Sequence, residues 1–460
     1  MKHRGRHRRR RRGQALRATL AGTALALTAA ATLISTSQAT GSGTPGGLTP
    51  LTSAAATGKL RLHENLVPRD TLDTLTKDMG GNVGVDGVLR TADHAMRDKA
   101  DCTADERAAL PVEPTATRAY CWERGDAQTR QWQPRSVTTS GDADDDGRWG
   151  EHRVILAGWS HNDHQAAAPT RDEGLARVAF VDATDPQALK YRWVLLVAPR
   201  ADGKDFTAVR SGLGGMVWYQ DKLIVTAAHG AGLLVFDMHR ILKTDVNSGA
   251  VGRVSGGYSA DGYQFVLPAI GSYDVTGGAC GTGTGTGAGA RTGTNAAVPC
   301  FGSLSLDRTT APDSLVATER ATSAGAERAR VWRYSYSTAA YRTGLLADSQ
   351  GYVDAVEAYE TKTAGLTGVL SHTPSGTREA EWYAGHAPDS RTQRGTLWRQ
   401  TERGAKAATC TADQSHACWG LGAESLSYWQ ETGELWTLTG AGAERTLYAV
   451  PLSAVDGSLD

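Results

Sequence analysis

The chain has 460 residues, and its 49 Lys and Arg are balanced by 49 Asp and Glu. The balance is uneven, because nine of the basic residues and none of the acidic residues lie in the first 39 positions. The rest of the chain therefore holds 40 basic and 49 acidic residues, a net charge of −9. An acidic protein repels nucleic acid and anionic membrane surfaces, so neither is an expected partner.

Residues 1–39 have the pattern of a cleaved export signal. A basic head that reaches Arg17 precedes an apolar stretch over 18–34 and a small-x-small tripeptide that ends at Ala39. This order predicts cleavage after Ala39 and a secreted, extracellular protein. A retained membrane anchor is the alternative, but the apolar stretch is rich in Ala and Thr and would make a weak spanning helix.

The export route is less well defined than the signal itself. Arg11-Arg12 leaves a twin-Arg route open, but the four residues that follow fit that motif poorly, so the Sec route is favoured. No Cys lies near the cleavage point and no apolar stretch occurs at the C-terminus. We therefore expect a soluble protein without stable membrane insertion after cleavage.

The next segments differ from each other in composition. Residues 40–59 are rich in Thr, Gly and Ala, which predicts a flexible linker. Residues 60–134 predict a short helical and irregular N-terminal section. Its clearest helix is predicted near Asp86, a plausible cap, because apolar residues recur there at helical spacing. These apolar residues are Val88, Leu89, Ala92, Ala95 and Met96.

From residue 135 to 460 the sequence predicts short strands rich in Val, Leu, Ile, Trp and Tyr, with Gly or Asp at the breaks. A unit of three strands recurs five times. The copies lie at 136–182, 215–237, 302–334, 366–399 and 424–450, and fourth strands are expected at 192–197, 263–267 and 353–356. Such repeated antiparallel units predict an all-β fold, a β-propeller. Five copies favour five blades, within a range of five to seven, and a β-sandwich is the rival architecture.

Six cysteines form three neighbouring pairs in the sequence. In an exported protein this pattern favours three local disulfides. The expected pairs are Cys102–Cys121, Cys280–Cys300 and Cys410–Cys418. A zinc site is the alternative, but no pair has the Cys-x-x-Cys spacing that zinc sites favour.

Several strand segments resemble those of an uncharacterised family of secreted actinobacterial proteins. They include Tyr191–Val197, Gly214–Tyr219, Leu234–Asp237 and Glu424–Tyr428. The resemblance covers roughly residues 115–455 and rests on strand cores. It implies export and a propeller-like fold, and it supplies no catalytic residue.

One acidic motif matches the opening of a calcium loop. Asp142, Asp144 and Asp146 occupy positions 1, 3 and 5, and Gly147 occupies position 6. Position 12 is Arg153, where a helical calcium loop has Glu, and the motif joins two predicted strands. The alternative is a solvated acidic turn, which Asp and Gly favour for ordinary reasons. Calcium is therefore the candidate cofactor, and these three carboxylates are its candidate ligands.

Other polar residues are weaker candidates. His161-Asn162-Asp163-His164 has metal-ligand types within four residues but also reads as an exposed polar loop. His229 and His386 end predicted second strands, and Glu424 and Glu381 open strands in similar places. Strand ends of a propeller can face its central channel, although a lone His there is more often a packed or solvated residue. No Gly-x-Ser-x-Gly motif of a serine hydrolase occurs, and no catalytic pair is predicted.

Three classes of function follow from these patterns. The favoured one is a non-catalytic propeller that binds a ligand or a protein, with carbohydrate or cell-wall polymer as candidate ligands. The alternative is a calcium-dependent extracellular hydrolase of the lactonase kind, which rests on fold analogy alone. A structural protein of the cell surface is the third, and it predicts a large exposed apolar patch. The sequence does not decide whether the protein is an enzyme.

Overall fold

The computed structural model describes residues 44–162, 171–280, 298–320, 328–339, 344–388, 393–440 and 444–459. The predicted signal over 1–39 lies outside these residues. The unit from Pro45 to Asp460 is mostly β, which confirms the predicted all-β class. None of its described helices is both long and apolar enough to cross a bilayer.

Twenty of the described strands form five groups of four, and within each group successive strands pair antiparallel. The first group holds β6 (Trp132–Thr139), β7 (Val154–His161), β8 (Ala176–Asp182) and β9 (Lys190–Pro199). The second holds β11 (Met216–Tyr219), β12 (Lys222–Thr226), β13 (Gly232–Asp237) and β17 (Phe265–Val275). The third holds β18 (Phe301–Asp307), β19 (Ser314–Glu319), β20 (Ala329–Ser335) and β22 (Glu357–Thr361).

The last two groups complete the set. The fourth holds β23 (Leu366–His372), β24 (Glu381–His386), β25 (Thr396–Thr401) and β26 (Gly404–Ala407). The fifth holds β27 (Ala423–Trp429), β28 (Glu434–Thr439), β29 (Thr446–Pro451) and a strand from far upstream, β5 (Arg118–Cys121). β9 and β17 also pair in parallel, which joins the first two groups into one larger sheet.

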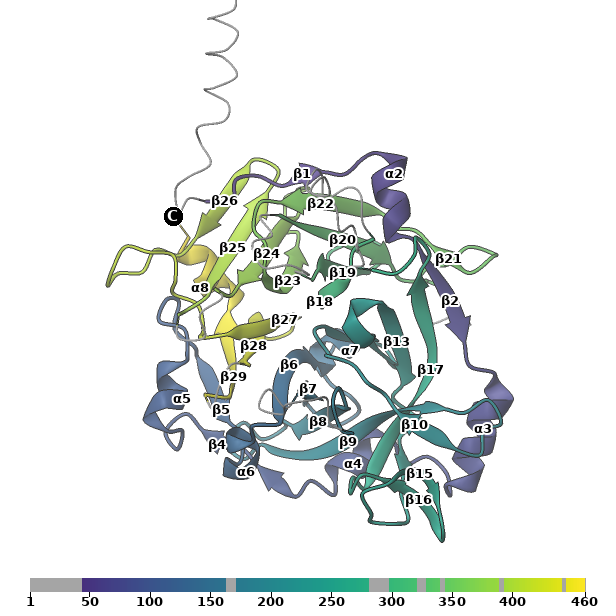
Figure 1. Cartoon of the computed structure of the whole chain (residues 1–460). Helices are drawn as coiled ribbons and strands as arrows, with labels where there is room; N and C mark the ends of the chain where they lie inside the picture. Colours follow the sequence, from purple (N-terminus) through teal and green to yellow (C-terminus); the bar gives the residue numbers. More distant parts are fainter. Residues whose placement is uncertain are drawn as a thin grey trace, which may run out of the picture. The chain divides into compact units, whose positions relative to one another are not determined.

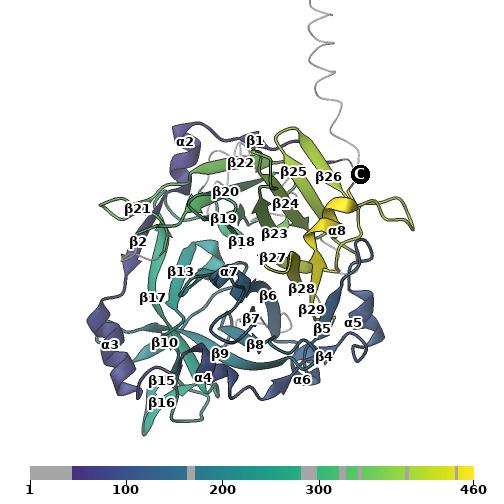
Figure 2. The ribbon, with the colours of Figure 1, turned by 180° about the vertical axis from the view of Figure 1, so that it is seen from behind.

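The first strand of each group lies at the centre. β6, β11, β18, β23 and β27 contact one another in that order, and β27 contacts β6 again. Figures 1 and 2 show the five groups arranged around these strands from both sides. Each innermost strand therefore has one edge paired within its group and the other edge near the common centre.

Five hydrophobic clusters hold the groups together, one at each junction. Trp218 and Phe180 pack between the first and second groups, and Leu315 and Val217 between the second and third. Corresponding clusters fill the junctions of the third with the fourth, the fourth with the fifth, and the fifth with the first. Each group is thus apolar on both faces, and burying both faces supplies the main stabilising term.

The fourth strands differ in part from the prediction. The fourth strand predicted at 353–356 is wrong. The fourth strand of the third group is β22, which begins at Glu357, while Val353 belongs to β21 (Tyr352–Val353), whose partner is β2 (Leu62–Leu66). The strand predicted at 263–267 starts at Phe265 and runs to Val275, since β2 pairs with its second half.

The section before residue 135 adds strands to these sheets. β1 (Thr49–Pro50) pairs with β22, β2 with β17, β3 (His94–Ala95) with β9, and β4 (Arg97–Asp98) with β5. In Figure 1 the purple segment from β1 to α3 runs along the outside of the strand groups. Its helices are α2 (Ala54–Thr57), α3 (Arg69–Asp78), α4 (Gly84–Leu89), α5 (Ala104–Ala108) and α6 (Arg124–Gln128).

Two local predictions are wrong in this section. Residues 44–59, the described part of the linker predicted over 40–59, contain β1, α2 and a 3-10 turn. These elements form because β1 pairs with the edge strand β22 and the Ser53 side chain caps α2. The predicted helix near Asp86 ends at Leu89, since His94 and Ala95 pair with β9. Val83 is its N-cap, and Asp86 lies in its first turn.

The remaining elements are short. α7 (Ser140–Ala143) follows β6, and α8 (Leu452–Gly457) follows β29. β10 (Phe206–Ala208) and β14 (Leu242–Lys243) add to the edges of β9 and β17, and β15 (Val251–Val254) and β16 (Gly257–Ala260) form a separate hairpin. The three predicted disulfides, Cys102–Cys121, Cys280–Cys300 and Cys410–Cys418, are all present.

Candidate functional site

The first residue of the predicted calcium loop is used inside the protein. Asp142 is buried in α7, where its carboxylate accepts hydrogen bonds from the Thr138 hydroxyl at 2.6 Å and the Ser427 hydroxyl at 2.7 Å. It also accepts from the backbone N–H of Thr139, the N-cap of α7. Burial raises the pKa of Asp142, and these hydrogen bonds and Arg308 oppose the rise. Asp142 therefore ties β6 to β27.

The other two carboxylates of the loop close local turns. Asp144 accepts from the N–H of Asp146 at 3.4 Å, and Asp146 accepts from the N–H of Arg148 at 2.8 Å. Among the described residues, the clusters with three possible metal ligands within 4.8 Å of one another include none of the three. The structure thus does not bring these carboxylates together, and calcium binding by the loop stays a prediction.

The second predicted metal motif is only partly described. His161 is buried at the end of β7, while Asp163 and His164 lie outside the described residues. Glu381 begins β24 and pairs with Arg399 at 3.3 Å, at the opposite end of its strand pair from His386. His229 follows β12 in a 3-10 turn with φ of 54°.

Glu424 lies where the innermost strand β27 begins, and it forms an ion pair across the junction to β6. Its Oε1 accepts a hydrogen bond from Nη1 of Arg135 at 2.8 Å. The two side chains are 19% and 32% exposed, so the pair is partly open to solvent. A residue of the first strand group and a residue of the fifth group thus present opposite charges side by side.

Both members of this pair lie at β-bulges. The register of β6 against β7 shifts between Pro134 and Ser136, around Arg135. The register of β27 against β28 shifts between Glu424 and Ser427. A bulge leaves a residue unpaired and re-aims its side chain, which is why bulges recur next to binding and catalytic sites. Here the bulge around Arg135 and the bulge that follows Glu424 both adjoin the ion pair.

Neighbouring residues hold the bulge of β27 in place. Ser425 has φ of 62°, a conformation that non-glycine residues rarely adopt. Its hydroxyl accepts from the N–H of Val137 at 3.2 Å and so fixes β27 to β6. Gly440, at the end of β28, leaves room for the pair, since a Cβ there would lie 2.8 Å from the Pro134 carbonyl oxygen and 2.9 Å from Glu424 Cγ.

Burial changes the acidity of Glu424. Desolvation raises the pKa of its carboxyl group, and the positive charges of Arg135 and Arg320 oppose the rise. Two arginines and one glutamate therefore define the charge at this place. A partly exposed carboxyl group with a shifted pKa beside a charged partner is a candidate for function. We call Arg135, Arg320 and Glu424 the Arg–Glu site.

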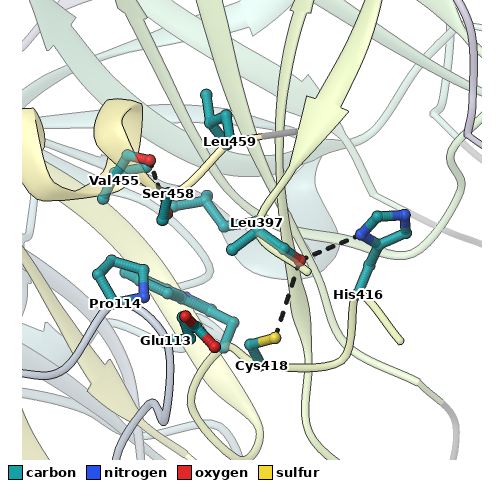
Figure 3. Close-up of a pocket in the computed structure, with 10 residues that line it drawn as sticks. Glu113, Pro114, Leu397, His416, Cys418, Val455, Ser458 and Leu459 are labelled. Atoms are coloured by element: carbon teal, nitrogen blue, oxygen red, sulfur yellow. Dashed lines mark hydrogen bonds between the residues drawn. The ribbon is translucent and has the colours of Figure 1, made fainter. Parts of the chain in front are cut away.

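A small cavity lies near the C-terminal helix, away from these residues. It is lined by Glu113, Leu397, His416, Cys418 and Leu459 among others, and its volume is about 10 Å³, close to that of one water position. Figure 3 shows its lining side chains, with His416 and Cys418 directed toward the same carbonyl oxygen, that of Ala408. The cavity has no room for a ligand.

A larger open groove of about 450 Å³ runs along β5. Its lining includes Asp98, Lys99, Arg118, Tyr120 and Gln187. Beside it, Arg118 pairs with Glu434 at 2.8 Å, the same distance as in the pair of Arg135 and Glu424. Arg118 and Glu434 lie on regularly paired positions of β5 and β28. They provide a comparison pair without bulges.

One residue of the Arg–Glu site is a candidate from the sequence. Glu424 is a candidate because it opens a predicted strand, whereas the predicted sites do not include Arg135, Arg320 or Gly440. One signal for Arg135 was available, because Pro134 interrupts a strand pattern and Pro within a sheet is confined to edges and bulges. The pairing of Arg135 with Glu424 had no sequence signal, since 289 residues separate them.

No protein-family model and no curated protein matches the chain. Among solved structures, one described as a "putative glycoside hydrolase" from Parabacteroides distasonis aligns with a TM-score of 0.27 and 8% identity. The alignment covers 69% of this chain and 86% of that chain. A TM-score this low assigns neither a fold nor a function.

Proposed function

We propose that this protein is an exported five-bladed β-propeller that binds a carbohydrate ligand at the Arg–Glu site without chemically changing it. The five strand groups around five innermost strands, with one hydrophobic cluster at each junction, support five blades. The final blade takes its outer strand, β5, from the N-terminal section, so the ring is closed by strands from both ends of the domain.

The observation that carries the binding proposal is the unused hydrogen-bonding capacity of the ion pair. Within the described residues, the pair uses one N–H of Arg135 and Oε1 of Glu424. A guanidinium group has five N–H donors and a carboxylate has about four lone-pair positions. Donors and acceptors therefore remain side by side on a partly exposed surface.

This arrangement matches a sugar. Each hydroxyl of a vicinal diol both donates and accepts, so one diol satisfies the carboxylate and the guanidinium at once. Charge-assisted hydrogen bonds of this kind are about twice as strong as neutral ones. Arg320 adds a second positive charge near Glu424, which favours a glycan that also carries a carboxylate.

The charge at the site supports binding over hydrolysis. Glycoside hydrolases as a rule use two carboxyl groups, about 5–10 Å apart. The charged groups that shift the pKa of Glu424 are Arg135 and Arg320, and no second carboxylate is among them in the described part of the chain. A lone carboxyl group between arginines suits recognition.

Export of the protein is part of the proposal. The three disulfides support an oxidising compartment outside the cytoplasm. The basic and apolar head over 1–39 supplies a signal for export.

An array of glycans and cell-wall polymers tests the proposal directly. We expect the purified protein to bind a subset of neutral or acidic glycans, and Arg135→Ala and Glu424→Gln to lose that binding. Arg118→Ala and Glu434→Gln serve as matched controls and are expected to bind as the wild type does. Binding that survives in the first two variants, or an array without any bound glycan, would overturn the proposal.

A further inference from the structure

A second cluster of chemically active side chains surrounds His94, outside the Arg–Glu site. His94 belongs to β3, which lies along the outer part of β9 opposite Tyr191. Glu123 is the N-cap residue of α6, and Asp126 lies in the first turn of that helix. The Glu123 side chain makes no capping hydrogen bond, so its carboxylate faces His94 instead.

The three side chains converge on one ring nitrogen. Nδ1 of His94 lies 2.5 Å from Oε2 of Glu123 and 3.8 Å from Oδ2 of Asp126. One ligand atom from each of the three residues falls within 4.8 Å of the other two. His94 is 30% exposed and Glu123 is 49% exposed, whereas Asp126 is 13% exposed. The cluster is therefore fixed on one side and open to solvent on the other.

We propose that His94, Glu123 and Asp126 form a binding site for a divalent transition-metal ion, with Zn²⁺ as the best match. One imidazole and two carboxylates are ligand types that Zn²⁺ accepts at about 2.0–2.2 Å. Ligand atoms of a tetrahedral ion are then about 3.3 Å apart. Glu123 moves outward by less than 1 Å and Asp126 inward by a similar amount to reach that spacing. Solvent supplies the fourth ligand.

The other side of the imidazole ring also has a carboxylate nearby. Nε2 of His94, the nitrogen opposite the proposed ion, lies 3.6 Å from Oδ1 of Asp93, which is beyond hydrogen-bond distance, and Asp93 pairs with Arg192. The imidazole also stacks on Tyr191, with ring centroids 4.9 Å apart.

Asp126 is oriented by several donors. Its carboxylate accepts from the Tyr191 hydroxyl at 2.7 Å, from Trp193 Nε1 at 3.0 Å and from Arg177 at 3.0 Å. Oδ2, the oxygen nearest His94, accepts two of these hydrogen bonds and Oδ1 accepts the third, so an ion at Oδ2 would replace one of the two donors there. A preoriented carboxylate loses little conformational freedom when an ion binds.

His152 provides the comparison that separates chelation from simple ion pairing. It also has two carboxylate neighbours at 3.2 Å, Asp86 at Nε2 and Asp182 at Nδ1. Because these carboxylates lie on opposite ring nitrogens, they cannot share one ion with the imidazole. His94 has Glu123 and Asp126 at the same nitrogen. A generic attraction of cations to acidic His clusters would affect both places, whereas chelation affects only the His94 cluster.

Competition with a chromogenic zinc chelator measures the affinity. The purified protein, stripped of metal, is titrated with ZnCl₂ at pH 7.5, and we expect one equivalent to bind. His94→Ala and Glu123→Gln should each weaken binding at least 10-fold, because each removes one ligand of the ion. His152→Ala should bind Zn²⁺ as the wild type does.

The exposed Glu123 keeps the test independent of folding, because its substitution removes no buried contact, and circular dichroism verifies each variant. The proposal is overturned if the wild type binds no Zn²⁺ or if Glu123→Gln binds it unchanged. It is equally overturned if His152→Ala weakens binding as much as His94→Ala does.

Discussion

Gly440 lies against the Arg–Glu site, and adding a single methyl group there should crowd Pro134 and Glu424. In Gly440→Ala the new Cβ would meet the Pro134 carbonyl oxygen at 2.8 Å and Glu424 Cγ at 2.9 Å. We expect the free energy of unfolding to fall by about 1–3 kcal/mol, the usual effect of overpacking. Urea denaturation measures the change.

Gly457→Ala is the matched control for that substitution. Gly457 is in the last turn of α8, and a Cβ there meets nothing within 4 Å. Ala is a better helix former than Gly by up to about 1 kcal/mol, so this variant should be as stable as the wild type or slightly more stable. An equal loss in both variants would show that Gly440 is not a place of close approach.

The raised pKa of Glu424 predicts that the difference in stability between the wild type and Glu424→Gln depends on pH. Its pKa in the folded protein is raised above the ordinary 4.5, so the folded state holds this proton more tightly than the unfolded state does. The resulting stability is present below pH 4.5 and is lost as pH rises through the raised pKa. Glu424→Gln has no carboxyl group at this position, so its stability does not change with pH for this reason.

Thermal melts of both proteins between pH 4 and 8 measure the effect. The melting temperature of the wild type, relative to that of Glu424→Gln, should fall as pH increases above 4.5. A difference that stays constant with pH, or that rises, contradicts a raised pKa at this position.

At the scale of elements, the strands that could be predicted are those with local apolar patterns. β11, β12 and β13 coincide with the predicted copy over 215–237, because each is short, apolar and bounded by a tight turn. β5 and β1 have no such local signal, since their partners, β29 and β22, lie more than 300 residues away. Bulges have none either, because a change of register is a property of two paired strands and not of one.

The acidic loop after β6, which contains Asp142, Asp144 and Asp146, can be tested for calcium binding by its effect on stability. Calcium that binds only the folded protein, at a concentration 100 times its dissociation constant, raises the free energy of unfolding by about 2.7 kcal/mol. Asp144→Ala would remove that increase. If the loop binds calcium as predicted, the melting temperature should be higher in calcium than in chelator, and Asp144→Ala should abolish that difference. Equal melting temperatures would contradict calcium binding and leave Asp144 and Asp146 as residues that close local turns.

Disulfide removal tests how β5 is held. The Cys102–Cys121 bond anchors β5 and closes a loop with a sequence separation of 19, against 8 for Cys410–Cys418. Loop-closure entropy predicts losses of about 3.3 and about 2.6 kcal/mol for the respective double Ser variants. Guanidinium denaturation compares them, and a larger loss for the shorter loop would contradict this account of β5.

At the scale of the whole molecule, ring closure creates the Arg–Glu site. Arg135 belongs to the first strand group and Glu424 to the last, and they meet because the fifth group packs against the first. The all-β class and the repeat pattern followed from the sequence. The contact between these two residues depends on how many strand groups there are and on the packing of the last group against the first. No local sequence pattern around Arg135 or Glu424 predicts that packing.

Isothermal titration calorimetry measures whether the protein binds a carbohydrate at the Arg–Glu site without turnover. The glycan that binds best on the array is titrated into the wild type, Arg135→Ala and Arg118→Ala. We predict saturable heat for the wild type, at least 10-fold weaker binding for Arg135→Ala and unchanged binding for Arg118→Ala. Equal affinity in all three proteins would contradict the site, and a sustained heat of reaction instead of saturation would contradict the non-catalytic function.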